Sequence, residues 1–264
     1  MEKLKPKIAI IGCGTMGCGI ARILGKQYPL ILYDRHAEKA ESLLSEFNAL
    51  VCSDLKDAVQ GANLIILAIQ PQNFLEIAKE LMGKLRNGKI VASIMAGVST
   101  KMLKQHLGNI SVLRVMPNVP CLYGKGVVGL VESSDITAEK KPLVEEVFSL
   151  LGSVHWIPEN KADSLTTITA SGPAFTYVMI ESIIDAGIAL GFSAELSKEL
   201  ALEMLAGAVE TVKVSGKHPG QLKWDVATPA GSTIAGLKQM EDEAVRSGII
   251  NTFLAANERL QEFS

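Results

Sequence analysis

The sequence predicts a doubly wound α/β domain followed by a second domain made only of helices. Up to residue 157, short apolar runs alternate with helical patterns, as in a parallel sheet whose strands are joined by crossover helices. Beyond Pro158, long segments rich in Ala, Leu, Glu and Lys indicate helices, and no run alternates with the period of a strand. We therefore expect two domains, residues 1–157 and residues 158–264.

The strands of the first domain are predicted from its apolar runs. Helical segments such as residues 73–85, with apolar residues three and four positions apart, separate most of these runs. This order predicts a sheet with helices on both faces. The predicted strands are 7–11, 30–34, 49–51, 63–69, 89–94, 111–116, 126–131 and 153–157.

The most apolar segment of the second domain, residues 164–191, predicts association with another subunit. The segment is apolar almost all round, and a helix without a polar face must be buried on most sides. A domain of roughly a hundred residues cannot easily bury so much apolar surface alone. We expect the helical domain to pack against a second copy, as a homodimer or a larger homo-oligomer.

The composition excludes several classes of function. The 264 residues carry 26 Lys and Arg against 28 Asp and Glu with no basic stripe, so no nucleic-acid partner is expected. No signal peptide is indicated, and the uncharged stretch 164–180 falls short of a membrane span, so we expect a soluble, cytoplasmic protein. The cysteines at positions 13, 18, 52 and 121 form no CxxC pair and have no His at ligand spacing, so neither a metal nor a disulfide framework is expected.

A GxGxxG sequence formed by Gly12, Gly14 and Gly17 lies between the first strand and a helix start. In this setting the first glycine makes a tight turn, the second lets a pyrophosphate approach the backbone, and the third lets helix and strand pack closely. The free N–H groups of the helix start, at Thr15 and Met16, then bind the phosphates. The motif predicts a Rossmann-type site for NADH or NADPH.

The residues after the second strand give opposite indications about the dinucleotide. Asp34 lies about twenty residues beyond the motif, where a carboxylate binds the ribose hydroxyls of NAD and repels the extra phosphate of NADP. Arg35 follows at once, and a guanidinium can bind that phosphate or stack on the adenine, with His36 adding to either. The sequence therefore does not decide between NADH and NADPH. A structural alternative is that Asp34 caps a helix and that its two basic neighbours are solvated.

Three later loops are expected to line the same crevice, because the carboxyl ends of parallel strands meet at one edge of a sheet. These loops are residues 68–72, 94–99 and 115–120, and their small residues and prolines leave room for a nicotinamide ring. Asn118 is a candidate hydrogen-bonding partner of the carboxamide or ribose. The candidate cofactor contacts in these loops are Ala68, Ile69, Gln70, Pro71, Ala96, Gly97 and Asn118.

Within the helical domain, residues 226–237 read VATPAGSTIAGL and carry no charge. This pattern indicates a turn followed by the start of a helix. Orphan N–H groups at a helix start can hold a small anion without any Arg, provided that the neighbouring side chains are tiny. Ala230, Gly231 and Ser232 meet that condition. A Pro-Gly turn followed by Ser/Thr capping of the helix is the structural alternative.

Over essentially its whole length the chain resembles the pyrroline-5-carboxylate reductase family. The resemblance is carried by IGCGTMG, RVMPNVP, ASGPAFTYVMIESIIDAGIALG and SGKHPGQLKWDVATPAGSTIAGL. It implies NAD(P)H-dependent reduction of the cyclic imine 1-pyrroline-5-carboxylate to L-proline, the last step of proline biosynthesis, in a dimer with interlocking helical domains. It also implies that Ala230, Gly231, Ser232 and Thr233 bind the substrate. The backbone N–H groups around Gly231, Ser232 and Thr233 would hold its carboxylate, and the hydroxyl of Thr233, the catalytic residue, would lie near the imine nitrogen.

The chain departs from the family pattern at several positions. TPAG stands where the family usually has SPGG, and a positive φ at Ala230 would cost about 1 kcal/mol or more. Ser232 replaces a usual Thr, Gln70 replaces a usual Lys, and Asp34 stands where many members have a neutral residue. None of these changes removes a residue on which the reaction chiefly depends.

Two other functions are compatible with a chain of this plan. A β-hydroxyacid dehydrogenase commonly takes its general base from a Lys on the first long helix of the second domain, but residues 170–191 contain no Lys. A non-catalytic NAD(P)-binding sensor has no use for the Gly231-Ser232-Thr233 loop.

Reduction of the imine requires little from the protein side chains. Hydride transfer to a protonated imine needs no strong general acid, because positioning of the nicotinamide against the imine carbon supplies most of the rate.

Overall fold

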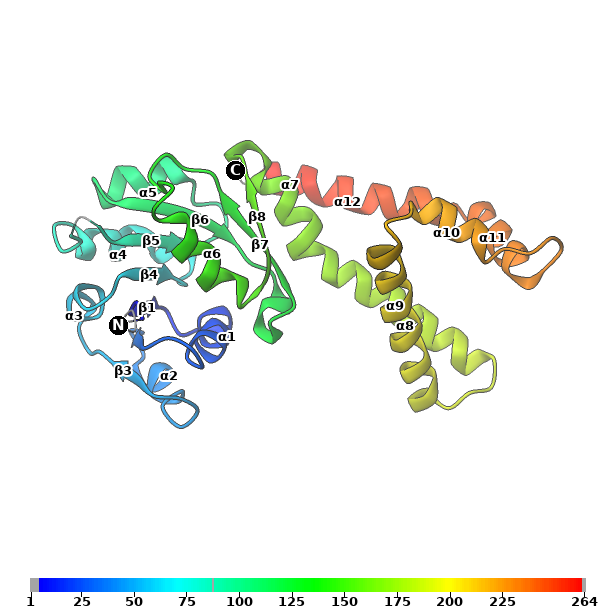
Figure 1. Ribbon diagram of the computed structural model, residues 1–264, viewed down its shortest axis with the longest axis horizontal. Coiled ribbons are helices and arrows are strands. Elements are labelled where there is room, and N and C mark those ends of the chain that lie inside the picture. The colour runs from blue at the N-terminus through cyan, green and yellow to red at the C-terminus, as the bar shows by residue number, and fades with distance from the viewer. Residues whose placement is uncertain (1–4, 87, 263–264) are drawn as a thin grey trace. The chain divides into compact units, whose positions relative to one another are not determined.

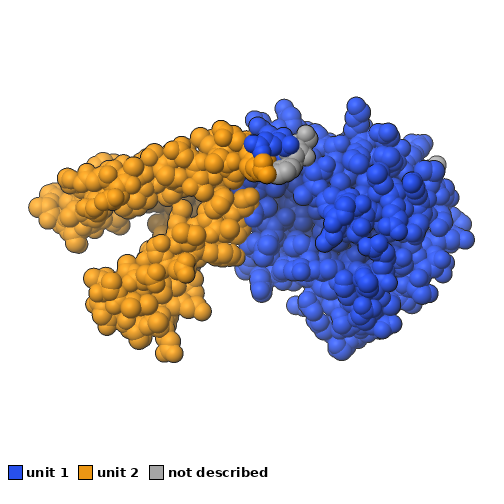
Figure 2. All heavy atoms as spheres, turned by 180° about the vertical axis from the view of Figure 1, so that it is seen from behind, with its two compact units in different colours: residues 1–170, 260–264 blue, residues 171–259 orange. Residues whose placement is uncertain are grey.

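The computed structural model describes residues 5–86 and 88–262 and divides into two compact units (Figure 2). Unit 1 contains the residues up to Ala170 together with those from Leu260 onward, and unit 2 contains Ser171–Arg259. The sequence predicts the boundary of the two functional domains after residue 157, where the last strand ends. That boundary stays a prediction, while the compact units divide further along the chain.

Unit 1 is built on an eight-stranded sheet in the order β3-β2-β1-β4-β5-β6-β7-β8 (Figure 1). Strands β1 to β6 run parallel, β7 is antiparallel to β6, and β8 is parallel to β7. The predicted doubly wound fold is confirmed, with the order reversing between β1 and β4. The strands are β1 Ile8–Ile11, β2 Leu30–Tyr33, β3 Ala49–Val51, β4 Leu64–Leu67, β5 Ile90–Ser93, β6 Ser111–Met116, β7 Gly126–Val131 and β8 Gly152–Ile157.

Helices cover both faces of this sheet, because neighbouring strand residues point to opposite sides. Ile8 and Ile10 pack into a core with α1, α2 and α6, whereas Ala9 and Ile11 pack into a second core with α3, α4 and α5. The α-helices are α1 Thr15–Leu24, α2 Ala37–Glu41, α3 Leu55–Gln60, α4 Phe74–Leu81, α5 Thr100–Leu107 and α6 Lys141–Ser149; the short helices are η1 Pro71–Asn73, η2 Val119–Tyr123 and η3 Glu159–Lys161.

Ion pairs of the buried Arg114 side chain hold the helical segment that begins at Glu159 to strand β6. The side chain of Arg114 is 7% exposed, and its Nη1 lies 2.9 Å from Glu159 Oε1 while Nη2 lies 3.5 Å from Asp163 Oδ1. Glu159 also accepts a hydrogen bond from the Thr100 hydroxyl at 2.5 Å. Burial raises the pKa of Glu159, but the bonds from Thr100 and Arg114 outweigh it and lower the pKa below the ordinary value. The segment continues as α7 Ala162–Thr166 and the π-helix η4 Thr167–Ser171.

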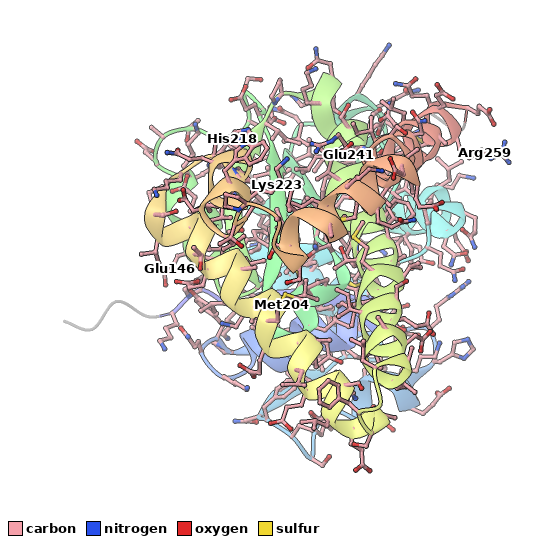
Figure 3. All side chains as sticks on the ribbon, turned by 90° about the vertical axis from the view of Figure 1, so that its right-hand side faces the viewer. Glu146, Met204, His218, Lys223, Glu241 and Arg259 are labelled. Atoms are coloured by element: carbon pink, nitrogen blue, oxygen red, sulfur yellow. The ribbon has the colours of Figure 1, made fainter. Side chains whose placement is uncertain are left out.

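Unit 2 is helical throughout, as the sequence predicts. Its helices are α8 Gly172–Ala189, α9 Ala194–Ser215, α10 Pro219–Asp225, α11 Ser232–Asp242 and α12 Val245–Gln261, the last of which runs on past Arg259. His218 caps α10, because its Nδ1 accepts a hydrogen bond from the Gly220 N–H at 3.1 Å (Figure 3). Among the described helices, none combines the length and hydropathy that a membrane crossing requires.

Unit 2 leaves much apolar surface uncovered within one chain. Of its residues, all of which the structure describes, only Gly172, Ser197 and Ala201 are buried. Val178 of α8 is 61% exposed, and Met204 of α9, labelled in Figure 3, is 51% exposed. The burial predicted for α8 therefore requires contacts that a single chain does not supply.

Candidate functional site

A pocket of about 290 Å³ lies beside the carboxyl ends of β1, β2 and β4, where the strand order reverses. This is the position at which doubly wound sheets bind ligands. Seven predicted cofactor residues line it, namely Gly12, Gly14, Asp34, Arg35, Ala68, Ile69 and Gln70. The other lining residues are Ile11, Tyr33, His36, Lys39, Asn73 and Ile77.

The three glycines of the motif have the geometry that dinucleotide binding requires. A Cβ on Gly12, whose φ is +100°, would lie 2.6 Å from the carbonyl oxygen of Ala68, and one on Gly17 would lie 1.9 Å from that of Gly12. A Cβ on Gly14 would meet nothing within 4 Å, so the backbone there is open to a ligand. Gly14 is also the N-cap of α1 and no side chain caps it, which leaves first-turn N–H groups for phosphate oxygens. The loop therefore fits a pyrophosphate.

Asp34 holds the glycine loop in addition to facing the pocket. Its Oδ2 accepts a hydrogen bond from the N–H of Cys13 at 2.7 Å, and its Oδ1 accepts one from the N–H of His36 at 2.9 Å. Cys13 stands between Gly12 and Gly14, so the carboxylate fixes the turn of the glycine motif. Each carboxylate oxygen retains a second lone pair that a ribose hydroxyl can use.

Three basic side chains are among those that line the pocket. Arg35 lies 3.4 Å from Glu76 in an exposed ion pair, and Nδ1 of His36 lies 3.7 Å from Glu38. Lys39 of α2 also lines the pocket but is not among the residues predicted to bind the cofactor. The available signal was helical spacing, because Lys39 follows His36 by three residues and so lies on the same side of the helix.

The remaining predicted cofactor residues lie at or near the same edge of the sheet but outside the lining of this pocket. Thr15 and Met16 begin α1, Pro71 begins η1, and Ala96 and Gly97 are exposed in the loop after β5. Thr15 lines an adjoining groove with Cys18 and Arg22. A cofactor role for these five residues stays a prediction.

Asn118 is the predicted cofactor residue with the most extensive structural bonding. The residue is only 6% exposed. Its Nδ2 donates a hydrogen bond to the carbonyl of Thr169 at 2.8 Å, and its Oδ1 accepts one from the N–H of Val127 at 2.9 Å. The thiol of Cys121 also points at Oδ1, at 3.5 Å. Only one N–H of the amide is left for a cofactor, whose contact with Asn118 stays a prediction.

The cysteines near the glycine loop are held as thiols. Desolvation by burial, followed by the charges of Cys18 and Asp34, raises the pKa of Cys13 to about 12, and burial also raises the pKa of Cys18. A thiol with a raised pKa is a poor nucleophile. All four cysteines are free, and the described residues contain no group of three His, Cys, Asp or Glu side chains placed to bind a metal.

In unit 2, the predicted substrate residues Ala230 and Gly231 belong to a β-turn that leads into α11, and Ser232 and Thr233 begin that helix. The N–H of Gly231 donates to the carbonyl of Thr228 at 3.1 Å, with Pro229 and Ala230 at the two central positions. Ala230 has a φ of +58°, the left-handed value that the third position of a type II turn requires. A Cβ on Gly231 would lie 2.3 Å from Thr228 Oγ1, so a larger residue there would require the Thr228 side chain to move.

The start of α11 is open, contrary to the capping alternative. Gly231 is the N-cap and no side chain caps the helix, while Ser232 and Thr233 occupy the first turn and are exposed. The unpaired N–H groups of a first turn favour an anion. This loop, which contains tiny side chains and no cation, can therefore hold a small carboxylate.

Comparisons with known proteins relate both units to one family. A family model described as pyrroline-5-carboxylate reductase dimerisation matches residues 159–263, and one described as NADP oxidoreductase coenzyme F420-dependent matches residues 7–97. The pyrroline-5-carboxylate reductase of Synechocystis sp. is 32% identical over 97% of each chain, and that of Kluyveromyces lactis is 34% identical over 92% of each chain. A Plasmodium falciparum pyrroline carboxylate reductase structure with NADP bound is 29% identical, with a TM-score of 0.86, and the match covers 100% of this chain and 99% of the other.

Replacing Ala230 by Gly should stabilise the protein. The left-handed φ costs an L-residue about 1 kcal/mol, and glycine removes this strain while it adds some entropy to the unfolded chain. We expect the free energy of unfolding in urea to rise by a few tenths to about 1 kcal/mol. Ala244, whose φ is +53°, gives a matched comparison, because Ala244→Gly should raise the free energy of unfolding by a similar amount. A lower free energy of unfolding for Ala230→Gly alone would contradict the strain argument.

Proposed function

The chain belongs to the pyrroline-5-carboxylate reductase family, and from that premise we propose that the turn at Thr228–Gly231 and the first turn of α11 bind the substrate of its reaction. The reaction is the NAD(P)H-dependent reduction of 1-pyrroline-5-carboxylate to L-proline, the last step of proline biosynthesis. The observation that carries the substrate assignment is that α11, which begins directly after Ala230 and Gly231, has no side-chain cap at its start. Its open N–H groups match the one carboxylate of this substrate.

The chemistry required of the protein side chains is limited. When bound, the reduced nicotinamide supplies a hydride to the imine carbon, and the imine nitrogen becomes an amine. We assign Thr233 the role of hydrogen bonding and orienting that nitrogen, with the proton coming from its hydroxyl, from water or from the already protonated imine. Ser232 and Gly231 hold the carboxylate through backbone N–H groups. Gly12, Gly14 and the first turn of α1 hold the pyrophosphate.

The test is steady-state oxidation of NADH and of NADPH, measured separately with 1-pyrroline-5-carboxylate, for the wild-type protein and for Thr233→Ala. We expect turnover by the wild type and a fall of about tenfold or more in kcat for the variant, which corresponds to the loss of one hydrogen bond in the transition state. The dissociation constant of NADPH should stay within about twofold, because Thr233 lies outside the dinucleotide pocket.

Two further variants complete this test. Thr233→Ser keeps the hydroxyl and should retain most of the activity, and Thr211→Ala removes an exposed helical hydroxyl of α9 and should behave as wild type. Unchanged kinetics in Thr233→Ala would remove Thr233 from the mechanism. A wild type that binds NADPH and does not reduce the imine would favour the sensor function or a β-hydroxyacid dehydrogenase.

We further propose that the pocket prefers NADPH to NADH. The support is the pairing of Asp34 with two backbone N–H groups, together with three basic side chains, Arg35, His36 and Lys39, on the lining. A 2′-phosphate gains from the cationic side chains of Arg35 and Lys39, and both are exposed enough to move toward it.

Opposite changes in cofactor selectivity are expected for Asp34→Asn and Lys39→Met. The first removes a negative charge, and should raise the ratio of kcat/KM for NADPH to that for NADH about tenfold, a shift equivalent to ~1.4 kcal/mol. The second removes a positive charge and should lower the ratio by a similar factor. Both NADH and NADPH should bind less tightly to Asp34→Asn, because one acceptor for the Cys13 and His36 N–H groups is lost. A ratio that neither variant moves would place the 2′-phosphate elsewhere.

We also propose that the assembly is a homodimer built on unit 2, or a larger oligomer of such dimers. The support is the apolar groove between α8 and α12, lined by Phe175, Val178, Ile249 and Phe253 among others, and the exposure of apolar side chains on α8 and α9. The description of the family model that matches residues 159–263 agrees with this role. A cytoplasmic location stays a prediction.

Light scattering of the purified protein should give at least twice the 28.2 kDa mass of one chain. Val178→Asp buries a charge at the proposed interface and should shift the protein toward the monomer, since an unpaired buried charge is strongly destabilising. Leu75→Asp places the same charge on an exposed apolar position of unit 1 and should leave the mass unchanged. A folded wild-type monomer at micromolar concentration would contradict the proposal.

A further inference from the structure

Asn118 joins three parts of unit 1 that are distant in sequence. It follows β6, its Oδ1 accepts a hydrogen bond from the N–H of Val127 in β7, and its Nδ2 donates to the carbonyl of Thr169 in the π-helix η4. The residue is 6% exposed, so these bonds form in a region with little competing water. The last of them spans 51 positions of the chain.

The carbonyl of Thr169 has a particular reason to need this donor. In a regular α-helix it would accept a hydrogen bond from the N–H of residue 173, but residue 173 is a proline and has no N–H. The proline ring also crowds the carbonyl four residues before it. The π-helix at Thr167–Ser171 lies where this conflict occurs, and the amide of Asn118 provides a donor in place of the missing one. Single-turn π-helices occur often at functional sites.

Two further contacts hold the same segment against the sheet. Arg114, four residues before Asn118, pairs with Glu159 and Asp163 ahead of the π-helix. Gly129 of β7 lies so close to Leu165 that a Cβ there would be 2.1 Å from Leu165 Cδ2. Asn118 provides the anchor nearest to Ser171, where unit 2 begins. Its amide therefore fixes the turn from which the chain enters the unit that carries the Gly231 loop.

We propose that Asn118 is a positioning residue of the reductase, which acts through the Thr169 carbonyl instead of binding the nicotinamide. This inference rests on the proposed function. Its amide oxygen is occupied by Val127 and Cys121 and one of its two N–H groups by Thr169, so the side chain is bonded mainly to protein. A displacement of about 1 Å in a positioning element can lower a rate about a hundredfold, so loss of this anchor should affect turnover.

Asn118→Asp tests the proposal with the smallest change in shape. The variant keeps an oxygen for the Val127 N–H and replaces the donor to Thr169 with a second oxygen, which repels the carbonyl. We expect kcat to fall at least about tenfold, while the dissociation constant of NADPH, measured by fluorescence titration, stays within about twofold. Asn109→Asp is the matched control, because it makes the same chemical change at an exposed position just before β6, and should behave as wild type.

Pro173→Ala offers a rescue that a purely structural role does not predict. The substitution restores an N–H at residue 173, which can donate to the Thr169 carbonyl. The double variant Asn118→Asp with Pro173→Ala should therefore lose less kcat than the product of the two single losses, a coupling that a double-mutant cycle measures. If Asn118→Asp does not fold, Asn118→Ser provides the same comparison of kcat with NADPH affinity.

Three results would overturn the proposal. A loss of NADPH affinity that parallels the loss of activity would make Asn118 a cofactor ligand. A lower Tm with unchanged kcat would restrict it to structural stabilisation, and strictly multiplicative losses in the double variant would separate it from the Thr169 carbonyl. Wild-type activity in the same assay keeps these results distinct from a failure of the proposed function.

Discussion

The site depends on one constraint, which is the burial of the sheet of unit 1 on both faces. Ile8 and Ile10 pack under one layer of helices while Ala9 and Ile11 pack under the other, so a strand can present ligand groups only beyond its ends. The glycine loop, Asp34 and the loop at Ala68 consequently meet beside the carboxyl ends of β1, β2 and β4. The Asp34 carboxylate then accepts a hydrogen bond from the N–H of Cys13, so one side chain both shapes the turn and lines the pocket.

The features that the sequence predicted are those encoded by neighbouring residues. A buried parallel strand requires a continuous apolar run, and all eight runs proved to be strands of one sheet. The three glycines have separate sterically defined roles that their spacing already states. The turn before α11 is predicted from the proline before Ala230 and the glycine after it, whereas the positive φ of Ala230 is a finding of the structure.

The features that the sequence did not reveal depend on contacts between distant segments. The sequence predicts that the loop containing Asn118 lies at the carboxyl edge of the sheet, and this loop follows the end of β6. The hydrogen bonds of the Asn118 side chain to Val127 and Thr169 depend on how β7 and the π-helix pack. Pro173 indicates that the carbonyl of Thr169 lacks its usual helical N–H donor. The neighbouring sequence does not indicate which side chain donates a hydrogen bond in its place. Lys39 is a different case, because its spacing of three residues from His36 on the helix is a local signal.

The two units also differ in what stabilises them, and this difference bears on the reaction. Unit 1 has two cores of its own, whereas the apolar faces of α8 and α9 are largely exposed in one chain. In the proposed dimer these faces are covered by association, so the stability of unit 2 depends on protomer concentration. The proposed substrate turn at Ala230 belongs to unit 2, whereas the residues that line the proposed dinucleotide pocket belong to unit 1. Dissociation would therefore impair substrate binding before it impaired cofactor binding.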